Sequence, residues 1–174
     1  MRRVDVELIG LGIVRHPVGS DVPALGYRLD RTELDNRLTP DQQAREMSVV
    51  AAIPAEVLHS TSWRHEDDGT VVLTYAVAPV APETDLLTPL PAPAIVCSGD
   101  PLRPAPGDLH THHVAAHAAR HLAYLLDRDP GIAEGVRRSV QPEFWALLHR
   151  TGEPPTDTHR ATHRRADSAA LQRI

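Results

Sequence analysis

An Asp-Gly pair between two strand-like segments constrains the fold of this chain more than any other feature. Residues 60–66 and 70–78 are rich in the β-branched, aromatic and hydroxyl side chains that favour strands, and Asp68-Gly69 lies between them. Asp-Gly suits a type I′ turn, because both central residues of that turn need a positive φ. The sequence therefore predicts an antiparallel hairpin with a two-residue loop.

The loop length also predicts which side chains share a face of the hairpin. A two-residue loop places Trp63 opposite Thr74, and we interpret Trp63 as an anchor in the core or at an interface. Arg64 and Glu66 are then expected at a solvated strand edge. An uncovered edge of this hairpin would favour dimerisation or partner binding.

The other elements follow from periodicity and capping signals. Apolar and acidic residues alternate from Val4 to Leu8, which predicts a half-buried strand reaching about Val14. One helix is expected over 40–52, and three C-terminal helices should follow, the first over 108–126. We predict an α+β fold in which a small antiparallel sheet carries these helices, including that over 40–52, on one face. The helix start signals are Thr39-Pro40 with Gln42, Asp108, Asp129-Pro130 and Gln141-Pro142.

Length and composition predict one globular domain over 1–152, a Pro-rich connection over 79–106 and a disordered tail over 153–174. There is no 18-residue apolar run, no signal peptide pattern and only one Cys, which together favour a cytoplasmic protein without a membrane span. The net charge of -5 and the lack of Arg-aromatic clusters argue against nucleic acid as a partner. All 18 basic residues are Arg, so Schiff-base lysines and the Lys-containing phosphate loop are excluded.

The chain contains 11 histidines, and several form a stripe along the 108–126 helix. Histidines four residues apart can bind one metal ion, because their rings project to the same side of a helix. His113 and His121 are separated by about 12 Å at ~1.5 Å per residue, so one ion could take only one neighbouring pair. The ion would be a divalent transition metal such as zinc. The candidate ligands are His113, His117 and His121, with His59, His65, Glu66 and Asp108 as the available further suppliers.

Two other interpretations of the stripe stay open. Amphipathic histidines can border a core while bonding to the backbone or facing solvent. Alternatively, their protonation near neutral pH can make a protein contact pH-sensitive without any metal.

Cys97 and Arg103 form a Cys-x5-Arg spacing after an apolar segment. In this spacing a thiolate can attack phosphorus while the Arg and backbone N–H groups hold the phosphate oxygens. The stretch resembles the loop of the low-molecular-weight tyrosine phosphatases, and the resemblance implies Cys97 as nucleophile, Arg103 as phosphate ligand and Asp129 as general acid. The chain departs from that family because the loop follows nearly a hundred residues and Pro101 removes one N–H.

Three functions follow from the sequence. The first is a non-catalytic binding or accessory module with a pH-sensitive histidine stripe, whose partner is another protein or a second copy. The second is a small metal-dependent enzyme using a histidine pair. The third is a cysteine-dependent phosphatase-like enzyme built on Cys97 and Arg103.

Overall fold

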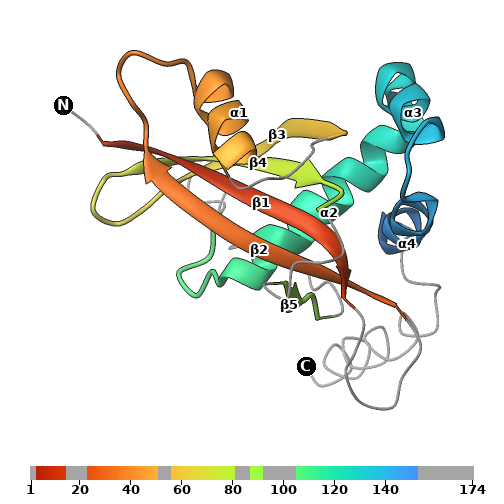
Figure 1. The fold of residues 1–174 in the computed structure, drawn as a ribbon. Coiled ribbons are helices and arrows are strands. Elements are labelled where there is room, and N and C mark those ends of the chain that lie inside the picture. Colours follow the sequence, from red (N-terminus) through yellow and green to blue (C-terminus); the bar gives the residue numbers. More distant parts are fainter. Residues whose placement is uncertain (1–2, 15–22, 51–55, 81–86, 92–104, 153–174) are drawn as a thin grey trace, which may run out of the picture.

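One mixed sheet of five strands in the order β3-β4-β1-β2-β5 forms the centre of the fold (Figure 1). The structure is a computed structural model and describes residues 3–14, 23–50, 56–80, 87–91 and 105–152. β1 pairs antiparallel with β2 and parallel with β4, while β3 pairs antiparallel with β4 and β5 with β2. The elements are β1 Val4–Val14, β2 Ala24–Glu33, α1 Pro40–Val50, β3 Val57–His65, β4 Val71–Ala78, β5 Thr88–Pro89, α2 Thr111–Arg128, α3 Pro130–Arg137 and α4 Pro142–Gly152.

The predicted α+β class is confirmed, with a sheet that is mixed rather than wholly antiparallel. A parallel pair needs a crossover connection. Here the chain passes through α1 and β3 before β4 returns beside β1. This long-range pairing leaves no signature in local periodicity.

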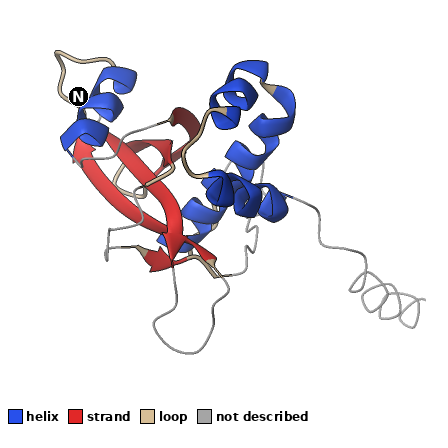
Figure 2. Cartoon of the chain, turned by 45° about the vertical axis from the view of Figure 1, so that its right-hand side comes forward, coloured by secondary structure: helices blue, strands red, loops and turns tan. Residues whose placement is uncertain are grey.

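The helices cover both faces of the sheet (Figure 2). Successive side chains of a strand point to opposite faces. On one face of β1, Val6 and Leu8 pack in a cluster with Ala44 of α1. On the other face, Ile9 and Leu11 pack with α2 and α4. The three C-terminal helices thus pack together as predicted. The expected placement of the 40–52 helix beside them is wrong, because β1 buries apolar side chains on both of its faces and each face needs a cover.

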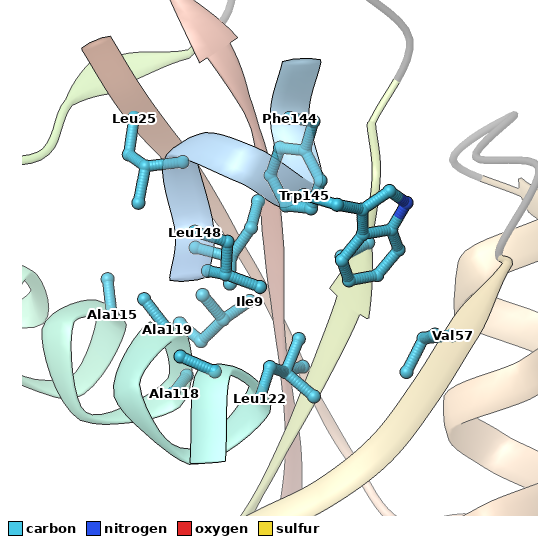
Figure 3. Packing of buried hydrophobic residues seen from close by; sticks show 14 of the residues in the cluster. Ile9, Leu25, Val57, Ala115, Ala118, Ala119, Leu122, Phe144, Trp145 and Leu148 are labelled. Atoms are coloured by element: carbon cyan, nitrogen blue, oxygen red, sulfur yellow. The ribbon is translucent and has the colours of Figure 1, made fainter. Parts of the chain in front are cut away.

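The larger of the two clusters lies between the sheet, α2 and α4 (Figure 3). α2 turns alanines toward the sheet, including Ala115, Ala118 and Ala119, so its backbone comes close to the strands. Phe144 and Trp145 of α4 fill the space beside α2, with their ring centroids 4.9 Å apart in an edge-to-face arrangement. This packing fixes the position of α2, and with it the position of the histidine stripe.

Two of the predicted helix starts are confirmed by their hydrogen bonds. Thr39 N donates to Gln42 Oε1 at 2.9 Å, and Gln42 N donates to Thr39 Oγ1 at 3.3 Å, which is a capping box. Asp129 Oδ1 accepts from Gly131 N at 2.8 Å and caps α3.

α2 begins later than predicted. The residue at its N-cap is His110 rather than Asp108, and His110 N donates to His113 Nδ1 at 3.2 Å.

The 60–78 hairpin is confirmed, but its loop is one residue longer than predicted. Glu66 N donates to Thr70 O and Gly69 N to Glu66 O, both at 2.9 Å, so the loop is Asp67–Gly69. Gly69 takes a φ of 85°, as the last residue of a three-residue hairpin loop does. The shift places Trp63 opposite Leu73 instead of Thr74.

No helix among the described residues is long and apolar enough to cross a membrane. The 153–174 tail lies outside the described residues, as does most of the 79–106 connection.

Candidate functional site

A bulge in the edge strand β3 sets the direction of its side chains. The register pairs Ser60 with Tyr75 and Ser62 with Thr74, so Thr61 is an extra residue in β3. An extra residue reverses the alternation of side chains between the faces. As a result His59 and Arg64 both face the side of the sheet that carries α2, although five positions separate them.

His59 meets the histidine stripe across the gap between β3 and α2. The ring centroids of His59 and His121 are 5.3 Å apart, and those of His121 and His117 are 6.4 Å apart. His59 Nδ1 contacts the Ser60 carbonyl oxygen at 2.6 Å, and that oxygen can only accept a hydrogen bond. The proton of a neutral His59 therefore lies on Nδ1, which leaves a lone pair on Nε2.

One ring nitrogen of His121, Nε2, is buried and has no hydrogen-bond partner in the described part of the chain. Burial lowers the pKa of His121, and the nearby imidazoles of His59 and His117 lower it further. The ring is therefore held in its neutral form near pH 7.

A second group of histidines lies at the start of α2. The ring centroids of His112 and His113 are 4.0 Å apart, and both rings lie 5.5 Å from that of His110. His113 Nδ1 accepts the hydrogen bond from His110 N described above, so its role is to cap the helix. Burial first, and then the neighbouring imidazoles, lowers the pKa of His112.

The predicted metal ligands thus lie in three separate places. His59, His117 and His121 lie together, while His113 is at the helix start. His65 contacts Trp63 edge to face at a centroid distance of 5.4 Å on the opposite side of the sheet. In the part of the chain that the structure describes, no three His, Cys, Asp or Glu side chains come together as a metal site.

A surface cavity of about 590 Å³ lies along the start of β3, between α1 and α3. β3 is the outermost strand of the sheet, so its outer backbone groups pair with no other described strand. The walls combine apolar and charged groups. They comprise Arg45, Ser48 and Val49 of α1, Glu56–His59, and Asp129, Gly131, Ile132 and Gly135 around α3.

Two acidic side chains are buried on the α2 side of the sheet, where the sequence suggested only alternation. The side chains of Asp5 and Glu7 are each 2% exposed. Arg64 Nη1 and Nη2 donate to Glu7 Oε1 and Oε2, both at 2.8 Å, and Thr74 Oγ1 donates to Glu7 Oε1 at 2.9 Å. The expectation that Arg64 lies at a solvated edge is therefore wrong, since its side chain is 14% exposed.

Arg31 joins the second buried carboxylate to the surface. Its guanidinium donates to Asp5 at 2.7 Å and to both oxygens of Glu66 at 2.7 Å. Burial alone would raise the pKa of Asp5, but the hydrogen bonds from Arg3 and Arg31 outweigh it and lower that pKa. Arg31 likewise lowers the pKa of Glu66. Each carboxylate of this network is engaged by an arginine, which suits a structural role.

Cys97 and Arg103 lie outside the described residues. The structure does place Asp129, which the phosphatase resemblance would make the general acid. Its carboxylate accepts backbone hydrogen bonds from Gly131 and Ile132 as the cap of α3.

Comparison of the chain with protein-family models, with curated proteins and with solved structures gives no match in any of the three.

Proposed function

We propose that this chain is a non-catalytic binding module that accepts an extended peptide segment of another protein along the edge strand β3. The observation that carries the proposal is the cavity along Glu56–His59, beside the outer edge of β3, which pairs with no other strand among the described residues. An extended peptide adds to such an edge through main-chain hydrogen bonds, and neighbouring pockets select its side chains.

The lining of the cavity indicates the chemistry of the peptide. Val49, Leu58 and Ile132 offer apolar contacts from three different elements. Arg45 makes no ion pair with any described carboxylate and is exposed at the cavity wall. A segment that alternates small apolar side chains with an acidic one would therefore complement this surface.

The bulge favours a short peptide over a second copy of the chain. It interrupts β3 after Ser60, so the regular edge beside the cavity is only the segment Val57–Ser60. Bulges of this kind hinder edge-to-edge pairing of whole sheets. His59 lies in the same segment and contacts His121, so protonation of His121 as the pH falls would add a charge beside this part of the surface and make binding pH-sensitive.

Selection from a displayed library of random octapeptides, followed by titration of the selected peptides, tests the proposal. Gly135 lines the cavity, and a Cβ built there meets no atom within 4 Å, so Gly135→Gln adds a large side chain at the cavity wall without a clash. Replacing a glycine inside a helix by Gln also favours the helix by roughly 0.5–1 kcal/mol, so we expect the variant to stay folded. The matched control is Gly107→Gln, which also has open space at its Cβ and lies outside the cavity.

We expect Gly135→Gln to weaken binding of the selected peptides at least tenfold, and Arg45→Glu to weaken acidic peptides selectively. Gly107→Gln should leave affinity within twofold. Peptides that bind both glycine variants equally well would contradict a site at β3. A stable dimer of the free chain that Gly135→Gln dissociates would identify a second copy as the occupant instead.

A further inference from the structure

We infer that His59 and His121 form a transition-metal site that joins β3 to α2 and takes an imidazole-preferring ion such as Zn²⁺. The inference does not depend on the proposed peptide site. It starts from two rings on different elements, brought to a centroid distance of 5.3 Å by the bulge in β3.

This separation fits two rings that share one ion. With a Zn–N bond of about 2.1 Å and about 1.1 Å from nitrogen to ring centre, each centroid lies ~3.2 Å from the metal. Two such rings at a tetrahedral angle have centroids about 5.2 Å apart. The observed centroid distance of 5.3 Å matches this separation.

The nitrogen atoms also fit the role of ligands. His59 donates from Nδ1 to a backbone carbonyl, which is the usual outer hydrogen bond of a metal-binding histidine and leaves Nε2 free to coordinate. His121 Nε2 is buried without a hydrogen-bond partner among the described residues, an arrangement that is destabilising unless something satisfies the atom. A bound ion is one of the recognised explanations for such an atom.

The described chain supplies two ligands to this site. His117 lies one turn before His121, but its centroid distance of 6.4 Å is near the limit for two rings on opposite sides of an ion. Water would therefore complete the coordination. Zn²⁺, Ni²⁺ and Cu²⁺ are the ions that imidazole ligands suit.

The histidines at the start of α2 are the competing site. His113 uses its Nδ1 as an acceptor for His110 N, which places the proton of the neutral ring on Nε2. His113 therefore has no free lone pair unless that capping bond breaks. This difference in tautomer favours the pair formed by His59 and His121.

Titration of the untagged full-length chain with ZnCl₂ at pH 7.5 tests the site, with calorimetry for affinity and NMR of the imidazole nitrogens for ligand identity. We expect saturable binding, with the largest shifts at Nε2 of His59 and His121. His59→Gln and His121→Gln should each weaken it at least tenfold. His149→Gln should leave the affinity within twofold, because His149 pairs with Asp127 away from the pair.

Circular dichroism of each variant without zinc confirms that it is folded. A second variant, His110→Gln with His112→Gln, separates the two histidine groups. Retained affinity in this double variant supports the inference. Loss of zinc binding there, or affinity within twofold in His59→Gln and His121→Gln, overturns it.

Discussion

Replacing Arg64 with Met tests whether the buried charge network stabilises the fold. Arg64 donates both terminal nitrogens to Glu7, whose side chain is only 2% exposed. Met retains most of the apolar stem of the arginine but removes its charge. Among the described residues, Thr74 then remains the one hydrogen-bond donor to the Glu7 side chain.

Breaking a buried ion pair by removing one partner costs about 3–5 kcal/mol, because the remaining charge stays buried. That cost is a large share of the roughly 5–15 kcal/mol that stabilises a typical domain. For a chain of this size, each kcal/mol lowers the Tm by about 2–4 °C. We therefore expect a decrease in Tm of roughly 6–20 °C for Arg64→Met.

Urea unfolding at pH 7 measures the change, and Arg3→Met is the matched control. Arg3 also bonds a buried carboxylate, that of Asp5, but its own side chain is 56% exposed. Asp5 retains Arg31 as a partner in that variant. We expect Arg3→Met to cost no more than about 1 kcal/mol, as is typical of exposed ion pairs.

The double variant Glu7→Gln with Arg64→Met separates lost pairing from lost packing. It should be less destabilised than the sum of the two single variants, because it leaves no unpaired charge. If Arg64→Met and Arg3→Met lower the free energy of unfolding by equal, small amounts, with an unchanged slope against urea concentration, the reasoning is refuted.

Three further predictions concern single positions. Burial, and then the two neighbouring imidazoles, lowers the pKa of His121 in the folded protein. Its contribution to stability is therefore full above about pH 6.5 and is lost as the pH falls through the folded pKa. His121→Gln should accordingly flatten the fall in Tm between pH 7 and 5. Gly69→Ala should cost about 1–2 kcal/mol in chemical unfolding because of its φ of 85°, whereas Gly107→Ala, with equally open space and an ordinary φ, should not be destabilising. A Cβ at position 26 would overlap the side chain of Val14 in β1. Gly26→Ala should therefore be the most destabilising of these changes in the same assay, and should increase hydrogen exchange at the β2–β5 contact.

Helix starts were predictable because their causes lie within three or four residues. Thr39 and Gln42 bond to each other, and Asp129 bonds to the N–H groups of the next turn. The exception is α2, where the N-cap residue is His110 rather than the predicted Asp108, and the ring of His113 accepts the hydrogen bond from His110 N. Histidine is not among the usual capping residues, so propensity gave no indication of it.

The register of the hairpin was not predictable from the turn alone. Asp-Gly suits both a two-residue loop and a three-residue loop that ends in a left-handed glycine. The loop length decides which of these two adjacent side chains is buried. The observed loop turns Arg64 toward Glu7 and leaves Trp63 64% exposed. The interpretation of Trp63 as a core residue is therefore wrong, while its role at an interface stays a prediction.

The sequence by itself determined the elements, because hydrogen bonding within a turn and the period of apolar residues are local. It predicted the α+β class, the hairpin, the capped helices and the stripe of histidines on one of them. The tertiary structure decided which of these features meet. Parallel pairing of β1 with β4, the bulge at Thr61 and the alanine face of α2 together bring His59 to His121 and bury Glu7 beside Arg64. Such contacts form between residues far apart in the chain and are stabilised by the burial of all of them together. The local period of apolar residues therefore does not predict them.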